Sequence, residues 1–316
     1  MNQAAISEQT AESVEATLRD ELARGDAMIA TARPILRHLL SNDDQALFSD
    51  EMIARVRGMM LDVAAQLLFA EAAADDARDR AGYVAERRDG LAQALFEDTA
   101  FLAHAHALAL EAQLSERLQA RSGIDAVLPP LVQELAAAKD PAMAGLAMSL
   151  LAAQARFMQH FRRMELPLRE LPGDLFHKAL LALRAQGAGP AEAAERALRD
   201  GYEEGAARLG LVARLVMGMG QGALRALSIH HAGLAVFATA LAMAAGQERD
   251  RTVLSFAERQ FARLALSLRA AGLKQQAVEE QFLYLHPEIA LPDGFEMLRP
   301  DRAAALLSAS QPEAAF

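Results

Sequence analysis

The sequence predicts an all-α protein, either an irregular helical bundle or a HEAT-like stack of antiparallel helix pairs, with about 10–13 helices. Ala and Leu dominate the 53% of residues that are hydrophobic, and both are strong helix formers. Aromatic residues make up only 5%, Trp is absent and β-branched residues are sparse, so strands lack their preferred residues. Apolar residues also recur at steps of three and four, which places them on one helix face.

Two segments show the complete helical pattern. Ser49 can cap a helix whose first turn carries Asp50 and Glu51, where negative charge stabilises the positive end of the helix dipole. Its apolar face comprises Met52, Ile53, Val56, Met59, Met60, Val63, Leu67 and Leu68. Asp140 precedes Pro141, which is the pairing of an N-cap with a proline at the first helical position. The helix that follows is expected to bury Met143, Leu146, Leu150, Leu151, Phe157, Met158 and Phe161.

The remaining helices follow from the same periodicity and from helix-ending residues. They are expected over residues 7–24, 26–40, 75–88, 98–121, 126–138, 174–186, 190–209, 211–227, 229–245, 251–271, 274–285 and 300–309. Gly123, Gly246 and Gly272 stand where helices should end, since glycine accepts the left-handed conformation that closes a helix. Pro190 and Pro300 mark helix starts. The connections are short, which makes neighbouring helices antiparallel.

One proline-containing segment, residues 164–174, interrupts the helical pattern. Pro167 and Pro172 bias the residues before them toward extended conformations, so no single helix can cross it. We therefore predict an N-terminal helical half over residues 1–165 and a C-terminal half over 166–316, with one continuous helical domain as the alternative. This segment is called the proline segment below.

Composition and the N-terminus favour a cytoplasmic protein. The absence of cysteine excludes disulfides, thiolate nucleophiles and Cys-ligated zinc. Residues 1–12 are polar and acidic, which is not the pattern of a secretory signal. The longest apolar stretch, 233–246, is shorter than the ~20 residues that cross a bilayer. We expect it to form a buried core helix and expect no membrane span.

The formal net charge of −10 argues against nucleic acid as a partner, because the chain repels phosphates. Residues 268–282 have a helix-turn-helix outline, but Glu279 and Glu280 would face the nucleic acid, so an ordinary helical hairpin is the better interpretation. Gly218, Gly220 and Ala223 fit a dinucleotide-binding spacing. Such a site also needs a preceding strand and an acidic residue ~20 positions on, but Arg214 interrupts the supposed strand and the next acid is Glu248, so close helix packing or a kink is favoured.

Four residues are low-ranking catalytic candidates. His104 and His106 project about 200° apart on a helix, so they cannot share a metal there. Asp174 and His177 have a spacing of three, which lets a carboxylate meet an imidazole. Asp174 also stands where an N-cap belongs, and capping explains it more simply.

Arg162, Arg163 and Arg169 form the one notable basic cluster. A solvated face is the simplest explanation for it, and contact with an anion or an acidic partner is the alternative. No phosphate-binding loop, serine nucleophile elbow or zinc-binding helix occurs. We therefore predict no cofactor-binding or metal-binding residue.

Four Ala/Leu-rich or proline-containing segments, residues 127–132, 142–156, 171–175 and 263–273, carry a family resemblance. They resemble a family of all-helical, HEAT-like alphaproteobacterial proteins of unknown function. The resemblance implies a bacterial helical bundle or HEAT-like stack, and it brings no catalytic residue.

These observations favour an interaction or scaffold protein that binds a protein partner through a helical surface. The 13 methionines fit either an adaptable contact surface or core filling. The alternative is a regulatory enzyme or a histidine phosphotransfer bundle that uses His177, His104 or His106. The sequence favours a non-enzymatic role over an enzymatic one and does not indicate the oligomeric state.

Overall fold

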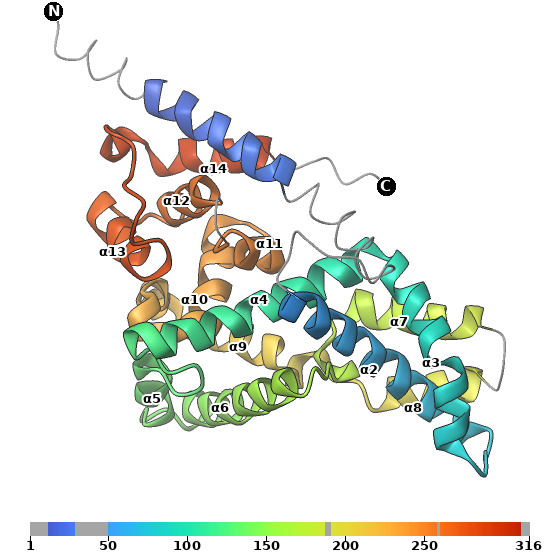
Figure 1. Ribbon diagram of the computed structural model, residues 1–316. Coiled ribbons are helices and arrows are strands. Elements are labelled where there is room, and N and C mark those ends of the chain that lie inside the picture. Colours follow the sequence, from blue (N-terminus) through green and yellow to red (C-terminus); the bar gives the residue numbers. More distant parts are fainter. Residues whose placement is uncertain (1–11, 29–49, 187–190, 258–259, 311–316) are drawn as a thin grey trace, which may run out of the picture. The chain divides into compact units, whose positions relative to one another are not determined.

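The computed structural model describes residues 12–28, 50–186, 191–257 and 260–310 (Figure 1). These residues form helices joined by turns and loops, and no β-strand occurs among them. The prediction of an all-α protein is therefore confirmed, and the described helices form a bundle.

The helices follow one another closely along the chain. Residues 12–28 are helical, and the later elements, with η for 3-10 helices, are α2 (Asp50–Ala74), α3 (Arg80–Glu97), α4 (Thr99–Ser122), α5 (Pro130–Ala136), α6 (Pro141–Arg162), η1 (Leu168–Glu170), α7 (Gly173–Ala185), α8 (Ala191–Asp200), η2 (Glu204–Ala206), α9 (Arg208–Gly218), η3 (Gly220–Leu227), α10 (Ile229–Ala245), α11 (Arg249–Leu254), α12 (Phe261–Ala270), α13 (Gln275–Leu285), η4 (Phe295–Met297) and α14 (Pro300–Ala309).

Several helix starts and ends agree with the signals in the sequence. α6 begins at Pro141, and the Ala142 N–H donates to Asp140 Oδ1 at 3.0 Å, so Asp140 caps the helix. α10 ends at Ala245, and its C-cap Gly246 has a positive φ of 62°. Ser49, the predicted cap of α2, lies outside the described residues.

Other predicted boundaries were wrong. The helix predicted over 75–88 is α3, which begins at Arg80 and continues to Glu97. The segment predicted as one helix over 251–271 contains two helices, because α11 ends at Leu254 and α12 begins at Phe261. The segments 190–209 and 211–227 form α8, η2, α9 and η3. Residues 29–40, part of the helix predicted over 26–40, lie outside the described residues.

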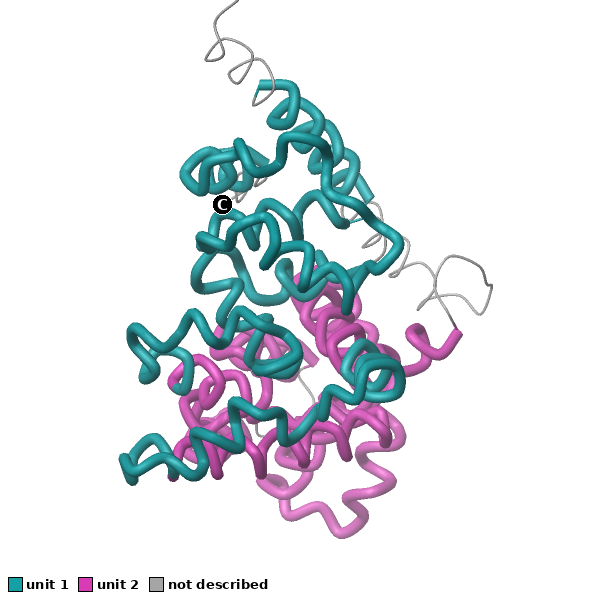
Figure 2. Tube along the Cα trace, turned by 90° about the vertical axis from the view of Figure 1, so that its left-hand side faces the viewer, with its two compact units in different colours: residues 1–32, 113–144, 215–316 teal, residues 33–112, 145–214 magenta. Residues whose placement is uncertain are grey.

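The chain forms two compact units, each built from separate stretches of sequence (Figure 2). Unit 1 comprises residues 1–32, 113–144 and 215–316, and unit 2 comprises 33–112 and 145–214. The chain passes between the units within α4, α6 and α9. The boundary predicted between residues 165 and 166 falls inside unit 2, because the proline segment packs against its own unit, as shown below.

The core of unit 2 forms around α2. This helix packs against α3, α7 and α8. Its predicted apolar face is buried with the exception of the half-exposed Ile53, and Val56, Met60, Val63 and Leu67 are fully buried. Burial of each such side chain stabilises the fold by about 1.5–3 kcal/mol relative to an exposed one.

The core of unit 1 forms around α10, which contacts α5, η3, α11, α12 and α13. The helix is kinked at Gly233, where φ is 71°. A Cβ atom at Gly233 would lie 2.8 Å from Pro129 Cγ, so only glycine allows this approach to the residue before α5. The helical residues 12–28 lie alongside α14 (Figure 1), with Val14 and Leu18 buried and Arg302 paired to Glu15 at 2.7 Å.

In the described residues, no individual helix has both the length and the apolar character needed to cross a bilayer. η3 and α10 meet the length and composition criteria only when they are taken together, and the pair is bent by 111°.

Candidate functional site

The proline segment lies along one face of α2 in unit 2. Gly58, Asp62 and Gln66 are four residues apart, so they project from the same side of the helix. The Leu166 N–H donates to Asp62 Oδ2 at 2.8 Å. Two residues later, the Leu168 N–H donates to Gln66 Oε1 at 3.0 Å. Four helical residues rise about 6 Å and two extended residues span about 6.6 Å, so the two repeats stay in register.

The start of the segment depends on the missing side chain of Gly58. A Cβ atom there would lie 2.5 Å from Met164 Cβ and 3.2 Å from the Met164 carbonyl oxygen. Met164 itself has a positive φ of 59°, so the chain turns sharply where α6 ends. Gly58 thus brings the segment close enough to α2 for the two later hydrogen bonds to form.

We predict that Gly58→Ala destabilises the protein by about 1–3 kcal/mol, because the added methyl group must displace Met164. The matched variant is Gly145→Ala in α6, where an added Cβ atom meets nothing within 4 Å. That change is expected to stabilise the protein by about 1 kcal/mol through helix propensity alone. Urea unfolding of both variants measures the difference, and equal stabilisation by the two alanines would contradict the close approach.

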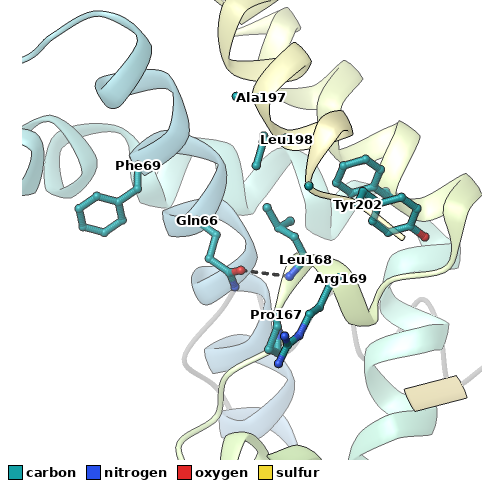
Figure 3. Close-up of a pocket in the computed structure, with 10 residues that line it drawn as sticks. Gln66, Phe69, Pro167, Leu168, Arg169, Ala197, Leu198 and Tyr202 are labelled. Carbon is teal, nitrogen blue, oxygen red and sulfur yellow. Dashed lines mark hydrogen bonds between the residues drawn. The ribbon is translucent and has the colours of Figure 1, made fainter. Parts of the chain in front are cut away.

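A pocket of about 500 Å³ opens between this segment, α2 and α8 (Figure 3). Its lining residues are Gln66, Phe69, Pro167, Leu168, Arg169, Phe176, Ala197, Leu198, Gly201 and Tyr202. Figure 3 shows Phe69 and Tyr202 on opposite sides of Leu168 and Leu198, with Arg169 beside Pro167. Most of these side chains are apolar, and Arg169 is the one charged residue among them.

Hydrogen bonds and ring stacking hold the pocket walls in place. The Gln66 amide donates to Asp62 Oδ2 at 2.8 Å and to the Leu166 carbonyl at 2.9 Å, so all its polar atoms are engaged within the structure. The Tyr202 and Phe176 rings stack with centroids 4.0 Å apart and planes within 4°. The Tyr202 hydroxyl donates to the Leu171 carbonyl at 2.8 Å. These contacts preform the pocket.

Burial changes the titration of two of these groups. It raises the pKa of the Asp62 carboxyl, against hydrogen bonds from Leu166 and Gln66 that favour the ionised form. Burial, followed by the charges of Glu204 and Asp174, raises the pKa of Tyr202 to about 12. Tyr202 therefore stays protonated and remains a hydrogen-bond donor at neutral pH.

Arg169 is the member of the predicted basic cluster that lies at the pocket. Its side chain is 53% exposed, and the nearest carboxylate oxygen, Glu170 Oε1, is 3.9 Å from its Nε. The other oxygen of Glu170 accepts the Arg208 N–H at 3.0 Å. Arg162 is the last residue of α6 and Arg163 follows it in the turn; both are exposed, and neither lines the pocket.

The catalytic candidates lie on two helices of unit 2, His104 and His106 on α4 and Asp174 and His177 on α7. His104 is buried in α4. His106 is half-buried, and burial lowers its pKa to about 4. His177 Nδ1 lies 3.2 Å from the Arg199 guanidinium. The capping prediction for Asp174 was wrong, because α7 begins one residue earlier, at Gly173, with Pro172 as its N-cap.

Two other pairs that contain histidine were not predicted. In unit 2, His160 Nδ1 lies 2.6 Å from Glu165 Oε2, across the turn in which Met164 has a positive φ. In unit 1, His231 Nε2 lies 3.6 Å from Glu134 Oε1. The first pair has a spacing of five, which matches no helical contact, and the second joins residues on two different helices. In the described part of the chain, no group of three or more His, Cys, Asp or Glu residues could hold a metal ion.

A buried ion pair at the start of α9 was also not predicted. Arg208 and Glu111 are both fully buried, and the guanidinium donates to both carboxylate oxygens, at 2.6 and 3.1 Å. It also donates to Gln154 Oε1 at 3.2 Å and lies 3.7 Å above the Phe157 ring. These groups come from three helices of unit 2 that are far apart in the sequence, so no local pattern could indicate them.

A second cavity, of about 470 Å³, lies in unit 1 between α9, η3 and α10. We call it the unit 1 groove. Its lining residues are Val216, Met217, Gly220, Gln221, Ala223, Leu224, Leu227, Ala240, Met243 and Ala244. Three of these side chains are large, apolar and exposed: Leu224 at 70%, Met217 at 60% and Met243 at 45%.

The glycines near the groove have packing roles, as the sequence predicted. A Cβ atom at Gly218 would lie 2.9 Å from Met143 Cε, and Gly220 has a positive φ of 51° where α9 gives way to η3. An ion pair between Arg225 and Glu134 then joins η3 to α5. The Arg225 guanidinium also lies 3.1 Å from His231 Nε2. These contacts fix the backbone next to Leu224.

Comparison of the chain with protein-family models, curated proteins and solved structures returned no match. The resemblance to HEAT-like alphaproteobacterial proteins therefore stays a prediction from the sequence.

Proposed function

We propose that this protein is an interaction module that binds a partner protein through the unit 1 groove. The observation that supports the proposal is the gathering of Met217, Leu224 and Met243, all exposed, around one cavity. Scattered exposed apolar residues are ordinary on a protein surface, whereas apolar residues that line a common groove mark interaction sites.

The apolar lining of the groove suits the apolar face of an amphipathic helix of the partner. Such a helix places apolar side chains at steps of three and four into a groove of this kind. Methionine side chains are flexible and polarisable, so Met217 and Met243 can adapt to the partner's side chains. Ala240 and Ala244 on α10, together with Gly220, leave space between these larger residues.

Burial of Leu224 contributes to the affinity. Transfer of an exposed leucine side chain into an apolar contact contributes about 1.5–3 kcal/mol. η3 already packs against α10 and buries Ala226 and Leu227, so the partner does not have to order it. A preformed groove loses less conformational entropy on binding.

The test compares Leu224→Asp with Leu283→Asp. Leu283 on α13 is also in unit 1 and is 65% exposed, but it does not line the groove. The tagged wild-type protein and both variants are incubated with an extract of the source cells, and bound proteins are quantified by mass spectrometry. The partner is then purified, and its affinity for each form is measured directly.

We expect Leu224→Asp to weaken binding of the purified partner at least about tenfold, in the range of an interface hot spot. Leu283→Asp should retain the wild-type affinity. A partner that binds both variants equally contradicts the proposal. Self-association or binding to lipid vesicles that Leu224→Asp abolishes would instead assign the groove to a second copy or to a membrane surface.

The HEAT-like arrangement and the cytoplasmic location remain predictions from the sequence.

A further inference from the structure

We propose that the pocket of unit 2 binds a small organic anion with an apolar body, which places its charged group against Arg169 and its apolar part against Phe69, Leu168 and Leu198. This site is separate from the unit 1 groove, because no lining residue is shared and the two belong to different units. The proposal does not depend on the function proposed above.

The positive charge of Arg169 indicates that the ligand is negatively charged. Its guanidinium is permanently protonated and has five N–H donors. Among the described residues it makes no hydrogen bond, and its closest carboxylate contact is the 3.9 Å approach to Glu170. Glu170 is directed inward, with a side chain 10% exposed and an oxygen bonded to the Arg208 N–H. The donors of Arg169 thus remain available to a carboxylate or a similar anion.

The apolar walls of the pocket indicate that the rest of the ligand is apolar. The Phe69 side chain is 47% exposed, although phenylalanine is usually buried. Leu168 and Phe176 form the buried base, and Pro167 and Leu198 add further apolar surface. Gln66 and Tyr202 direct their polar atoms to backbone groups of the protein. The pocket therefore offers one cationic group and otherwise mainly apolar contact.

The size of the pocket is sufficient for a small molecule. A volume of about 500 Å³ falls in the range of about 300–1,000 Å³ that is typical of small-molecule sites. The hydrogen bonds of Gln66 and the stacked Phe176 and Tyr202 rings hold the walls in place before a ligand arrives. The net charge of −10 gives no general attraction for anions, so the affinity must come from Arg169 and the apolar walls.

The test uses two anionic probes and one neutral probe. Decanoate represents alkyl carboxylates and naphthalene-2-carboxylate represents aryl carboxylates, while 1-decanol has the alkyl chain without the charge. Binding to the full-length protein is measured by isothermal titration calorimetry at low ionic strength. The variants are Arg169→Gln, Ala197→Trp, Arg163→Gln and Leu224→Asp. Circular dichroism and thermal unfolding establish that each variant is folded.

Arg169→Gln is expected to weaken binding of the preferred carboxylate about tenfold and to leave 1-decanol binding unchanged. Ala197→Trp, which fills the pocket from an exposed position on α8, is expected to abolish binding of all probes that the wild type binds. Arg163→Gln removes the same charge from a residue outside the pocket and should change nothing. Leu224→Asp should also change nothing, which separates this site from the groove.

The preferred carboxylate should also bind more weakly at high salt, because Arg169 is partly exposed to solvent. Two results would overturn the proposal. One is the failure of both carboxylates to bind the wild-type protein at millimolar concentration. The other is equal carboxylate affinity in the wild-type and Arg169→Gln proteins.

Discussion

Replacing Arg208 with alanine is expected to lower the free energy of unfolding by about 3–5 kcal/mol, because it leaves a buried carboxylate without its cation. Glu111 is fully buried and accepts two hydrogen bonds from Arg208. The substitution also removes the contact with the Phe157 ring and the hydrogen bond to Gln154. Chemical denaturation of the purified protein measures the loss.

The matched control is Arg184→Ala. Arg184 makes the same two-point contact with Glu195, at 2.8 and 2.7 Å, but its side chain is 56% exposed. Glu195 is itself buried, but water reaches the exposed Arg184 guanidinium and Arg199 stays 3.8 Å from the carboxylate, so the loss should be smaller. Similar losses in the two variants would contradict the role assigned to burial.

A double variant separates the cost of an unpaired charge from the value of the pair. In Arg208→Met combined with Glu111→Leu, both charges are replaced by apolar groups of similar size. Buried ion pairs replaced in this way are often neutral or stabilising by about 1–4 kcal/mol. We expect the double variant to be more stable than Arg208→Ala. If the double variant is less stable than Arg208→Ala, the attraction between the two charges stabilises the protein by more than an unpaired buried carboxylate destabilises it.

The second large effect concerns the pH dependence of stability through His106. Burial lowers the pKa of His106 from 6.5 to about 4. Between these two values the unfolded chain binds a proton at this position and the folded protein does not, so acid favours unfolding. The stabilising contribution is complete above pH 6.5 and is lost as the pH falls toward 4. Its full size is about 3 kcal/mol.

The measurement is the free energy of unfolding of the wild-type protein and of His106→Gln at intervals between pH 7 and pH 4. Glutamine does not titrate, so the variant should lose less stability over this range, by up to about 3 kcal/mol. The comparison uses the slope of the free energy of unfolding against pH in the two proteins, and it does not depend on the absolute stability of the variant. Parallel pH profiles would show that His106 is protonated in the folded protein as readily as in the unfolded chain.

Local signals predicted the fold class and many helix boundaries. Composition alone favoured helices, and the pairing of Asp140 with Pro141 located the start of α6. The break between α11 and α12 was not predictable, because no proline or glycine occurs between residues 251 and 271. The structure has a tertiary contact at this place: the buried Gln260, just before α12, donates its amide to the Gly25 carbonyl at 2.9 Å.

The candidate sites were predictable only in part. The proline segment was predicted, and Arg169 was placed in a basic cluster for which anion or acidic-partner contact was the alternative to a solvated face, because prolines and clustered arginines are visible in the sequence. The pocket beside them was not, since its walls come from α2, the proline segment, α7 and α8. The spacing of four between Gly58, Asp62 and Gln66 could have indicated the helix face on which the proline segment lies. The pairing of Arg208 with Glu111, 97 residues apart, had no such sign.

The most direct test of the proposed docking function is photo-crosslinking in the source cells. A benzophenone amino acid is introduced at position 224 or, as a control, at position 283, and crosslinked products are identified by mass spectrometry after irradiation. We expect a partner protein to be crosslinked from position 224 and not from position 283, with its attachment point in an amphipathic helix. The same products from both positions, or no protein product from position 224, would contradict it.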